Sequence, residues 1–200
     1  MPSARARVAV SIMMMIVFAG VVYLAFWVRN HGFSARERPS RVEEFLARHA
    51  RKIATPSGAR ELKNPYTATS ESTAEARDHW VAHCSSCHGL DGRGDTPIGR
   101  NLYPKAPDMN DAETQRLSDG ELFYIISNGV RFTGMPAWGN EDSPESIWQL
   151  VSFIRRLPQL SPEEKMMMEE LASGKIAEGK PGAPKPHTHS HAPGTGPHKH

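Results

Sequence analysis

Apolar residues form one continuous run near the start of the chain and afterwards recur at helical spacing. The run from Val8 to Val28 contains 21 residues without a charge. At 1.5 Å per residue, a helix of that length spans about 31 Å, which matches a bilayer core of about 30 Å. The pattern therefore predicts one membrane-spanning helix.

A cleaved secretory signal is the alternative for this run, because Arg5 and Arg7 precede it as they would in a signal peptide. However, the run is longer than the apolar part of such signals. It also ends in Phe26-Trp27-Val28-Arg29 and not in a small-residue cleavage site. We therefore expect an uncleaved anchor.

Five shorter segments follow in which apolar residues repeat at helical spacing, each behind a helix start signal. The signals are the capping-box pairs Ser40 and Glu43, Ser72 and Glu75, and Ser118 and Glu121, and the serine-proline pairs that begin at Ser143 and Ser161. Gly129 predicts a left-handed cap after the third helix, and Pro158 ends the fourth. No segment alternates as a strand would, so the sequence predicts an all-α fold.

The helix that follows Ser40 is short, basic and amphipathic. Its apolar face and the cations beside it comprise Val42, Phe45, Leu46, His49 and Ile53 with Arg48, Arg51 and Lys52. Such a helix suits the outer leaflet of a membrane or a partner subunit, and an ordinary solvated spacer is the plainer interpretation. The sequence leaves all three open.

Both cysteines of the chain stand in Cys84-Ser85-Ser86-Cys87-His88. This C-x-x-C-H pattern is typical of the covalent attachment of c-type haem. The two thiols add to the vinyl groups of the porphyrin, and the histidine supplies one axial ligand to the iron. We therefore expect one haem c, held covalently by Cys84 and Cys87, with His88 on the iron.

Three other uses of this pattern are less well supported. A structural zinc site usually takes its four ligands from two such pairs, and the chain has no second cysteine pair. A thioredoxin-type redox pair has no need of the adjacent histidine. A disulfide between Cys84 and Cys87 would close a small, strained loop.

A second iron ligand is expected downstream, where the chain reads Gly134-Met135-Pro136-Ala137-Trp138. Over residues 70–158 the chain resembles a class I cytochrome c, in which the methionine of a G-M-P-x-aromatic loop is the sixth ligand. The resemblance implies that Met135 binds the iron, and a thioether ligand raises the redox potential. Met109 is the competing methionine, but it lies close to the haem motif, on the side expected for His88.

The same resemblance implies two packing features. The first and last helices of the domain should cross closely, with Ala76 and Trp80 against Leu150 and Phe153. A proline carbonyl, which we assign to Pro107, should accept the ring N–H of His88 and fix its tautomer.

These motifs predict a one-electron carrier, namely a membrane-anchored monohaem cytochrome c in a periplasmic or respiratory chain. No catalytic triad, phosphate loop or paired-carboxylate motif indicates an enzyme in its own right. Two alternatives remain. One is a haem-bearing electron-transfer subunit of a multi-subunit dehydrogenase or oxidase, and the other is a haem sensor or peroxidase with an open sixth site.

Charge is separated along the chain, although the net charge is only +2. Residues 29–63 contain nine Lys and Arg against four Asp and Glu, whereas residues 75–156 contain eight against twelve. An acidic haem domain on a basic stalk favours a positively charged redox partner, and nothing indicates nucleic-acid binding.

The resemblance places the haem domain in the bacterial periplasm and the anchor in the inner membrane as a single span. Flanking charge opposes this orientation, because Arg29, Arg36, Arg38 and Arg41 after the run outnumber Arg5 and Arg7 before it. We give the site of haem attachment greater weight than the charge count.

The last residues form a tail of proline, glycine and histidine that lacks apolar residues to fold around, so we expect disorder there. Half of the chain's ten histidines make up a candidate Cu, Ni or Zn site: His187, His189, His191, His198 and His200. A low-complexity tail without function is the simpler alternative.

The predicted organisation has six parts. Residues 1–7 are cytoplasmic, 8–28 span the membrane, and 29–69 form a basic amphipathic stalk and linker. Residues 70–158 form the haem domain, 159–174 a C-terminal helix, and 175–200 the His-rich tail.

Overall fold

The computed structural model describes residues 3–32, 34–36 and 39–174, and this part of the chain is helical without a strand. The α-helices are α1 (Ala4–His31), α2 (Arg41–Ala54), α3 (Ser57–Glu61), α4 (Ser70–His79), α5 (Ser85–His88), α6 (Ala112–Gln115), α7 (Asp119–Asn128), α8 (Pro144–Arg156) and α9 (Pro162–Ala172). A π-helical turn, η1 (Trp80–Cys84), joins α4 to α5, and the 3₁₀ turns are η2 (Gly99–Asn101) and η3 (Leu157–Gln159). The all-α prediction is confirmed.

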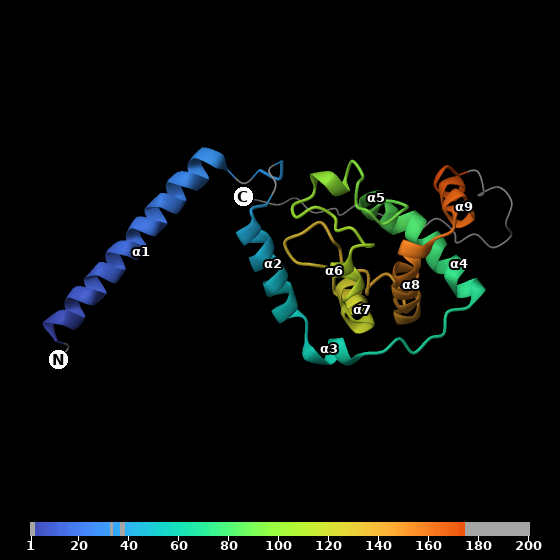
Figure 1. Ribbon diagram of the computed structural model, residues 1–200, viewed down its shortest axis with the longest axis horizontal. Coiled ribbons are helices and arrows are strands. Elements are labelled where there is room, and N and C mark those ends of the chain that lie inside the picture. Colours follow the sequence, from blue (N-terminus) through green and yellow to red (C-terminus); the bar gives the residue numbers. More distant parts are fainter. Residues whose placement is uncertain (1–2, 33, 37–38, 175–200) are drawn as a thin grey trace, which may run out of the picture.

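Helix α1 projects away from the other helices (Figure 1). It is 28 residues long, contains no buried residue, and is long and apolar enough to cross a membrane. Ser3 caps its first turn by accepting a hydrogen bond from the Ala6 amide at 3.3 Å. The apolar run found in the sequence therefore lies within one unbroken helix.

The core of the domain is built where α4 and η1 cross α8. Ala76 is only 2% exposed, and beyond it the Trp80 and Phe153 rings lie with their centroids 5.9 Å apart. The small Ala76 side chain lets the two backbones approach. This crossing confirms the packing that the resemblance implied.

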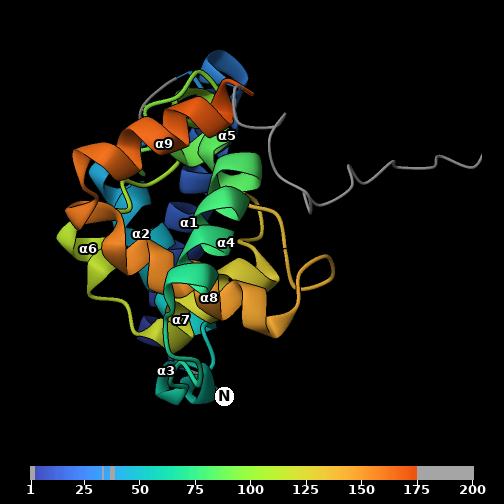
Figure 2. The same ribbon diagram turned by 90° about the vertical axis from the view of Figure 1, so that its right-hand side faces the viewer.

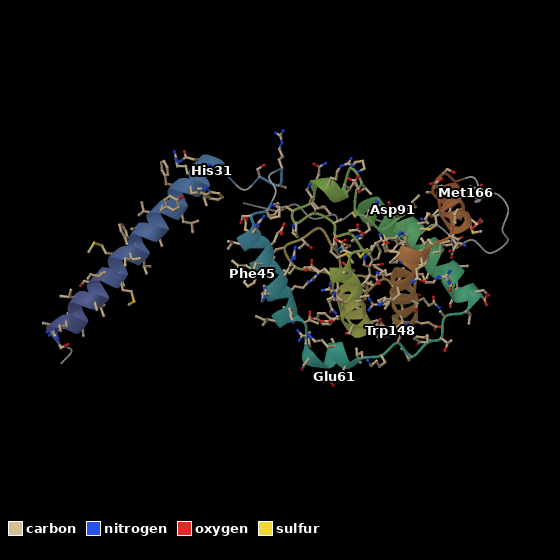
Figure 3. The ribbon with its side chains drawn as sticks, viewed as in Figure 1. His31, Phe45, Glu61, Asp91, Trp148 and Met166 are labelled. Carbon is tan, nitrogen blue, oxygen red and sulfur yellow. The ribbon has the colours of Figure 1, made fainter. Side chains whose placement is uncertain are left out.

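Helix α7 packs along another side of α8. The rings of Phe123 and Trp148 stack at 4.3 Å, and Figure 3 shows Trp148 between the two helices. Where α7 begins and α8 ends, Arg155 forms an ion pair with Asp119 at 2.8 Å. Apolar stacking and a charged contact thus fix the same pair of helices.

Most of the predicted helix starts are correct and one is wrong. Complete capping boxes begin α2 at Ser40, α7 at Ser118 and α9 at Ser161, while Ser143 caps α8. Helix α4 instead begins behind Thr69, and Ser72 is the residue that reaches back to it. The prediction of Ser72 and Glu75 was wrong because a threonine three residues upstream can form the same reciprocal pair.

Helix α3 was not predicted, and it joins the stalk to the domain. Ala59 of α3 is buried, and its carbonyl oxygen lies so close to Gly120 of α7 that a side chain at Gly120 would overlap it. Further along, the Asn64 amide donates to the Trp148 carbonyl at 3.1 Å and to Ser152 Oγ at 2.9 Å. The segment between α2 and α4 is therefore fastened to α7 and α8.

Helix α9 packs on α4 and η1 (Figure 2). Met168 is 1% exposed and belongs to the same apolar core as Trp80 and Phe153. Met168 therefore joins the helix that we expected to follow the haem domain to the core of that domain. Met166 and Met167 are exposed, so one turn of the helix supplies only one side chain to the core.

Candidate functional site

The C-x-x-C-H motif lies at the end of the helical stretch that begins with α4. The π-helical turn η1 leads into α5, which contains Cys87 and His88. Both thiols are free and partly exposed, whereas His88 is 8% exposed. Single π turns are common at functional sites because they shift the side chains that follow them around the helix. Here the turn ends at Cys84, the first cysteine of the motif.

The imidazole of His88 is buried beside Trp80 of η1 and faces the loop that contains Pro107. Its ring lies 5.9 Å from that of Trp80, whose indole N–H donates to the Gly89 carbonyl at 3.1 Å. Burial lowers the pKa of His88, and the facing Pro107 carbonyl raises it by a smaller amount. The ring is therefore held neutral, with a lone pair for a metal.

The Pro107 carbonyl faces His88, in agreement with the prediction, but the contact is loose. Within the described part of the chain, His88 Nδ1 is buried and has no hydrogen bond of standard length and angle. The Pro107 carbonyl nevertheless interacts with the ring, because it raises the pKa of His88 against the larger effect of burial.

The loop after the motif brings Pro107 to this position. Gly94 adopts φ 69° and its amide donates to the His88 carbonyl at 2.7 Å. A side chain at Gly94 would overlap the Ala106 carbonyl oxygen, so only glycine permits this approach. Thr96 fastens the loop to α5 by donating to the Ser86 carbonyl at 2.8 Å.

Met135 lies in the loop between α7 and α8 and is partly exposed. Its carbonyl accepts from the Val130 amide at 3.1 Å, and its amide donates to Thr133 Oγ1 at 3.1 Å. A side chain at the neighbouring Gly134 would overlap Leu102 Cδ2 at 2.6 Å, and Leu102 belongs to the loop that follows the haem motif. The chain thus holds the Met135 loop against the loop that leads to Pro107.

Met109, the competing methionine, has a packing role. Its amide donates to the Gly92 carbonyl at 2.7 Å, and its side chain packs against the apolar core. A side chain at Gly92 would meet Met109 Cβ at 3.3 Å and Leu157 Cδ1 at 2.8 Å. Met109 therefore fills space between the loop and the core.

A polar cluster beside Cys84 was not predicted. The His79 and His83 rings lie 4.7 Å apart, and the Trp138 ring lies edge-on to His83 at 5.5 Å. Asp142 Oδ2 approaches His79 Nε2 to 3.2 Å, a charge contact that lacks the alignment of a hydrogen bond. The spacing of His79 and His83 by four residues was the only sequence signal for this cluster.

The cluster changes the protonation of its members. Burial lowers the pKa of His79, Asp142 raises it, and His83 lowers it further. Burial is also the main reason that the pKa of the Cys84 thiol rises to about 12, with Asp142 next. The Cys84 sulfur is therefore a neutral thiol at physiological pH until it is bonded.

Two metal sites were considered besides the haem site. Among the described residues, no three His, Cys, Asp or Glu side chains are placed to hold a metal ion. The tail histidines His187, His189, His191, His198 and His200 lie outside the described residues.

Comparison with known proteins matches the chain to one family model and to solved structures. Residues 71–154 match the family model described as "Cytochrome C oxidase, cbb3-type, subunit III". Among solved structures, the chain is similar to a component of the reducing HAO-like protein complex of Kuenenia stuttgartiensis, at 22% sequence identity and a TM-score of 0.44. That match covers 49% of this chain and 50% of the other, so this chain spans about half the length of the protein it matches.

Proposed function

We propose that the class I c-type cytochrome domain within this chain, residues 71–154, passes single electrons while α1 holds it to a membrane. The observation that carries the proposal is the position of His88 in the C-x-x-C-H motif. The imidazole is buried, kept neutral, and faced by a carbonyl at one nitrogen, as an axial haem ligand requires.

The residues around the motif fit one haem c. Cys84 and Cys87 are not joined to each other, so both thiols are available for thioether formation. His88 would bind one face of the iron, and Met135 is our proposed ligand on the other. When bound, haem supplies a metal that accepts and releases one electron. The protein fixes the ligands and, by burying the imidazole, limits the access of water.

The membrane location belongs to the same proposal. Helix α1 contains the whole run from Val8 to Val28, and we propose that it spans the inner membrane once with the haem domain in the periplasm. The charged positions that follow the span, Arg29 and Arg36, would then lie on the periplasmic side. Redox proteins in that compartment would be its donor and acceptor.

A second candidate function follows from the description of the matching family. The family is described as a subunit of an oxidase. By analogy, this chain would serve as the haem-bearing electron-transfer subunit of a multi-subunit oxidoreductase. Purification of the full chain from native membranes in mild detergent separates the two candidates. Stoichiometric recovery of a catalytic chain favours the subunit, and recovery of the cytochrome alone favours the independent carrier.

Covalent haem attachment is the first test of the proposal. Replacing Cys84 and Cys87 together by alanine should remove haem staining from the denatured protein, because each thiol forms one thioether. Each single replacement should weaken staining. Staining of the double variant at wild-type strength would refute a c-type haem.

The sixth ligand is tested by a matched pair of methionines. Met135→Ala should lower the midpoint potential and let CO or cyanide bind, because the thioether ligand is lost. Met109→Ala is the control, since Met109 packs against Gly92 and the core, and it should leave the spectrum almost unchanged. The opposite result would make Met109 the ligand. An open sixth site in the wild type would instead favour a haem sensor or peroxidase.

A further inference from the structure

Helix α2 turns its polar side toward its own domain. Glu43 Oε1 accepts a hydrogen bond from the Tyr103 hydroxyl at 3.0 Å, and Arg48 forms an ion pair with Glu113 at 3.1 Å. Arg48 also pairs with Glu44 on α2 itself at 3.3 Å. These contacts fix which side of the helix faces the domain.

The apolar side of α2 is left uncovered. Val42, Leu46 and Ile53 lie close to one line along the helix and are 66%, 58% and 83% exposed. Phe45 extends this apolar strip and is 58% exposed. A helix that packed on its own domain for stability would bury these residues and expose the charged ones. In α2, however, no residue is buried, and these apolar side chains are at least as exposed as Glu44 and Arg48. The apolar strip therefore indicates a surface outside the chain.

The tether from α1 restricts where that surface is. Helix α1 ends at His31 and α2 begins at Arg41, so nine residues join them. Nine extended residues reach at most about 30 Å. Figures 1 and 3 show α2 on the edge of the domain nearest to α1, with His31 at the end of α1 that faces it. If α1 spans a bilayer, α2 is held within reach of the same bilayer's surface.

Charge on α2 favours an anionic lipid surface. Four Arg and Lys residues stand against two Glu residues between Arg41 and Ala54. By helical geometry, Arg41 and Lys52 both lie along one edge of the apolar strip, where they border the groove between α2 and the domain. Both are exposed, and neither forms an ion pair with any residue in the described ranges. Both side chains can therefore extend to lipid phosphates while their alkyl stems cover the apolar strip.

We infer that α2 lies in the headgroup region of the bilayer that α1 spans, with Val42, Leu46 and Ile53 toward the acyl chains and Arg41 and Lys52 on anionic lipid phosphates. The inference rests on the proposed membrane span of α1. It places the haem domain against the membrane surface, because the polar side of α2 is bonded to Tyr103 and Glu113. Electron transfer would then take place close to the membrane.

The test is amide hydrogen exchange of the full-length holoprotein in lipid nanodiscs. One set of discs contains only phosphatidylcholine, and the other also contains phosphatidylglycerol. Amides of residues 42–53 should exchange at least about tenfold more slowly in the anionic discs than in detergent. The visible haem spectrum verifies that each variant is folded.

Two double variants separate the apolar strip from the charge of the helix. Leu46→Glu with Ile53→Glu should abolish the slow exchange. Ala47→Glu with Ala54→Glu adds the same charge at exposed positions away from the strip, and this variant should keep most of the slow exchange. Equal loss in both would show that only charge matters and would overturn the role of the apolar strip.

Other occupants of the strip give different results. If amide exchange of α2 in detergent becomes slower as the protein concentration rises, a second copy of the chain covers the strip. If exchange becomes slow only after a partner protein is added, the strip is a protein interface. Either result overturns the inference, as does equal exchange in both kinds of disc. If α1 is protected in the discs while α2 exchanges freely, this inference fails and the anchor stands. Free exchange of α1 would refute the anchor itself.

Discussion

Helices α8 and α2 follow the same design and have opposite surroundings. Both begin behind a serine cap, they contain 13 and 14 residues, and both carry apolar side chains on one face. On α8 that face is buried, with Ile147 and Phe153 1% and 2% exposed. On α2 the equivalent face is open, and Ile53 is 83% exposed. An amphipathic pattern therefore predicts a helix and a covered face, but it does not tell what covers that face.

The difference has an energetic consequence. Apolar area removed from water contributes about 25 cal/mol per Å² to stability. The residues of α8 gain this when the domain folds, because α4 and α7 cover them. The apolar residues of α2 gain it only when something outside the chain covers them. Folding and membrane binding should therefore respond to substitutions in different helices.

The largest expected effect separates these two helices directly. Phe153→Ala removes a ring that packs on Trp80 in the core and should lower the free energy of unfolding by about 3–5 kcal/mol. Leu46→Ala on α2 should change it by less than about 0.5 kcal/mol, because that side chain is already exposed. Urea unfolding of both variants in detergent measures the two values. A comparable loss in both would mean that α2 is covered by its own domain.

Local sequence signals predicted the parts of this molecule that depend on neighbouring residues. The serine caps of α2, α7, α8 and α9 were read from short patterns and are present in the structure. The crossing at Ala76 was implied by the resemblance to class I cytochromes c, and it too is present. The contacts that were missed join residues far apart in the chain. Met168 reaches the core from α9, and Asp142 approaches His79 across 63 positions of sequence. No periodicity marks such contacts.

Helix α3 shows most clearly why some elements were not predicted from the sequence. It has only five residues, and no side chain caps its start. It is stabilised by its contact with Gly120, a glycine that is unremarkable inside a helical pattern. Isolated helices of this length do not persist in water, so tertiary packing decides whether such a segment is helical.

The second expected effect concerns this connection between the two regions. Gly120→Ala places a methyl group against the Ala59 carbonyl oxygen and 2.9 Å from Leu62 Cβ. Backbone atoms cannot move aside cheaply, so we expect a loss of about 1–3 kcal/mol in unfolding free energy and faster amide exchange in α3. Gly58→Ala is the matched control within α3, because no atom lies within 4 Å of its added methyl group. Equal effects of the two substitutions would contradict the docking of α3 on α7.

The smallest expected effect is the response of the buried region to acid. Because burial lowers the pKa of His79, the unfolded chain binds a proton there near pH 6.5 while the folded protein does so only at lower pH. This contribution to stability is therefore fully present above pH 6.5 and is lost as the pH falls through that value toward the folded pKa.

The two neighbours of His79 provide the test, because Asp142 raises the pKa of His79 and His83 lowers it. Asp142→Asn should thus increase the loss of stability between pH 7.5 and 5, and His83→Gln should decrease it, each by less than about 1 kcal/mol. Urea unfolding at the two pH values measures the differences, and His79→Gln should remove the contrast between the two variants. If the contrast persisted without His79, another group would be responsible for the acid response.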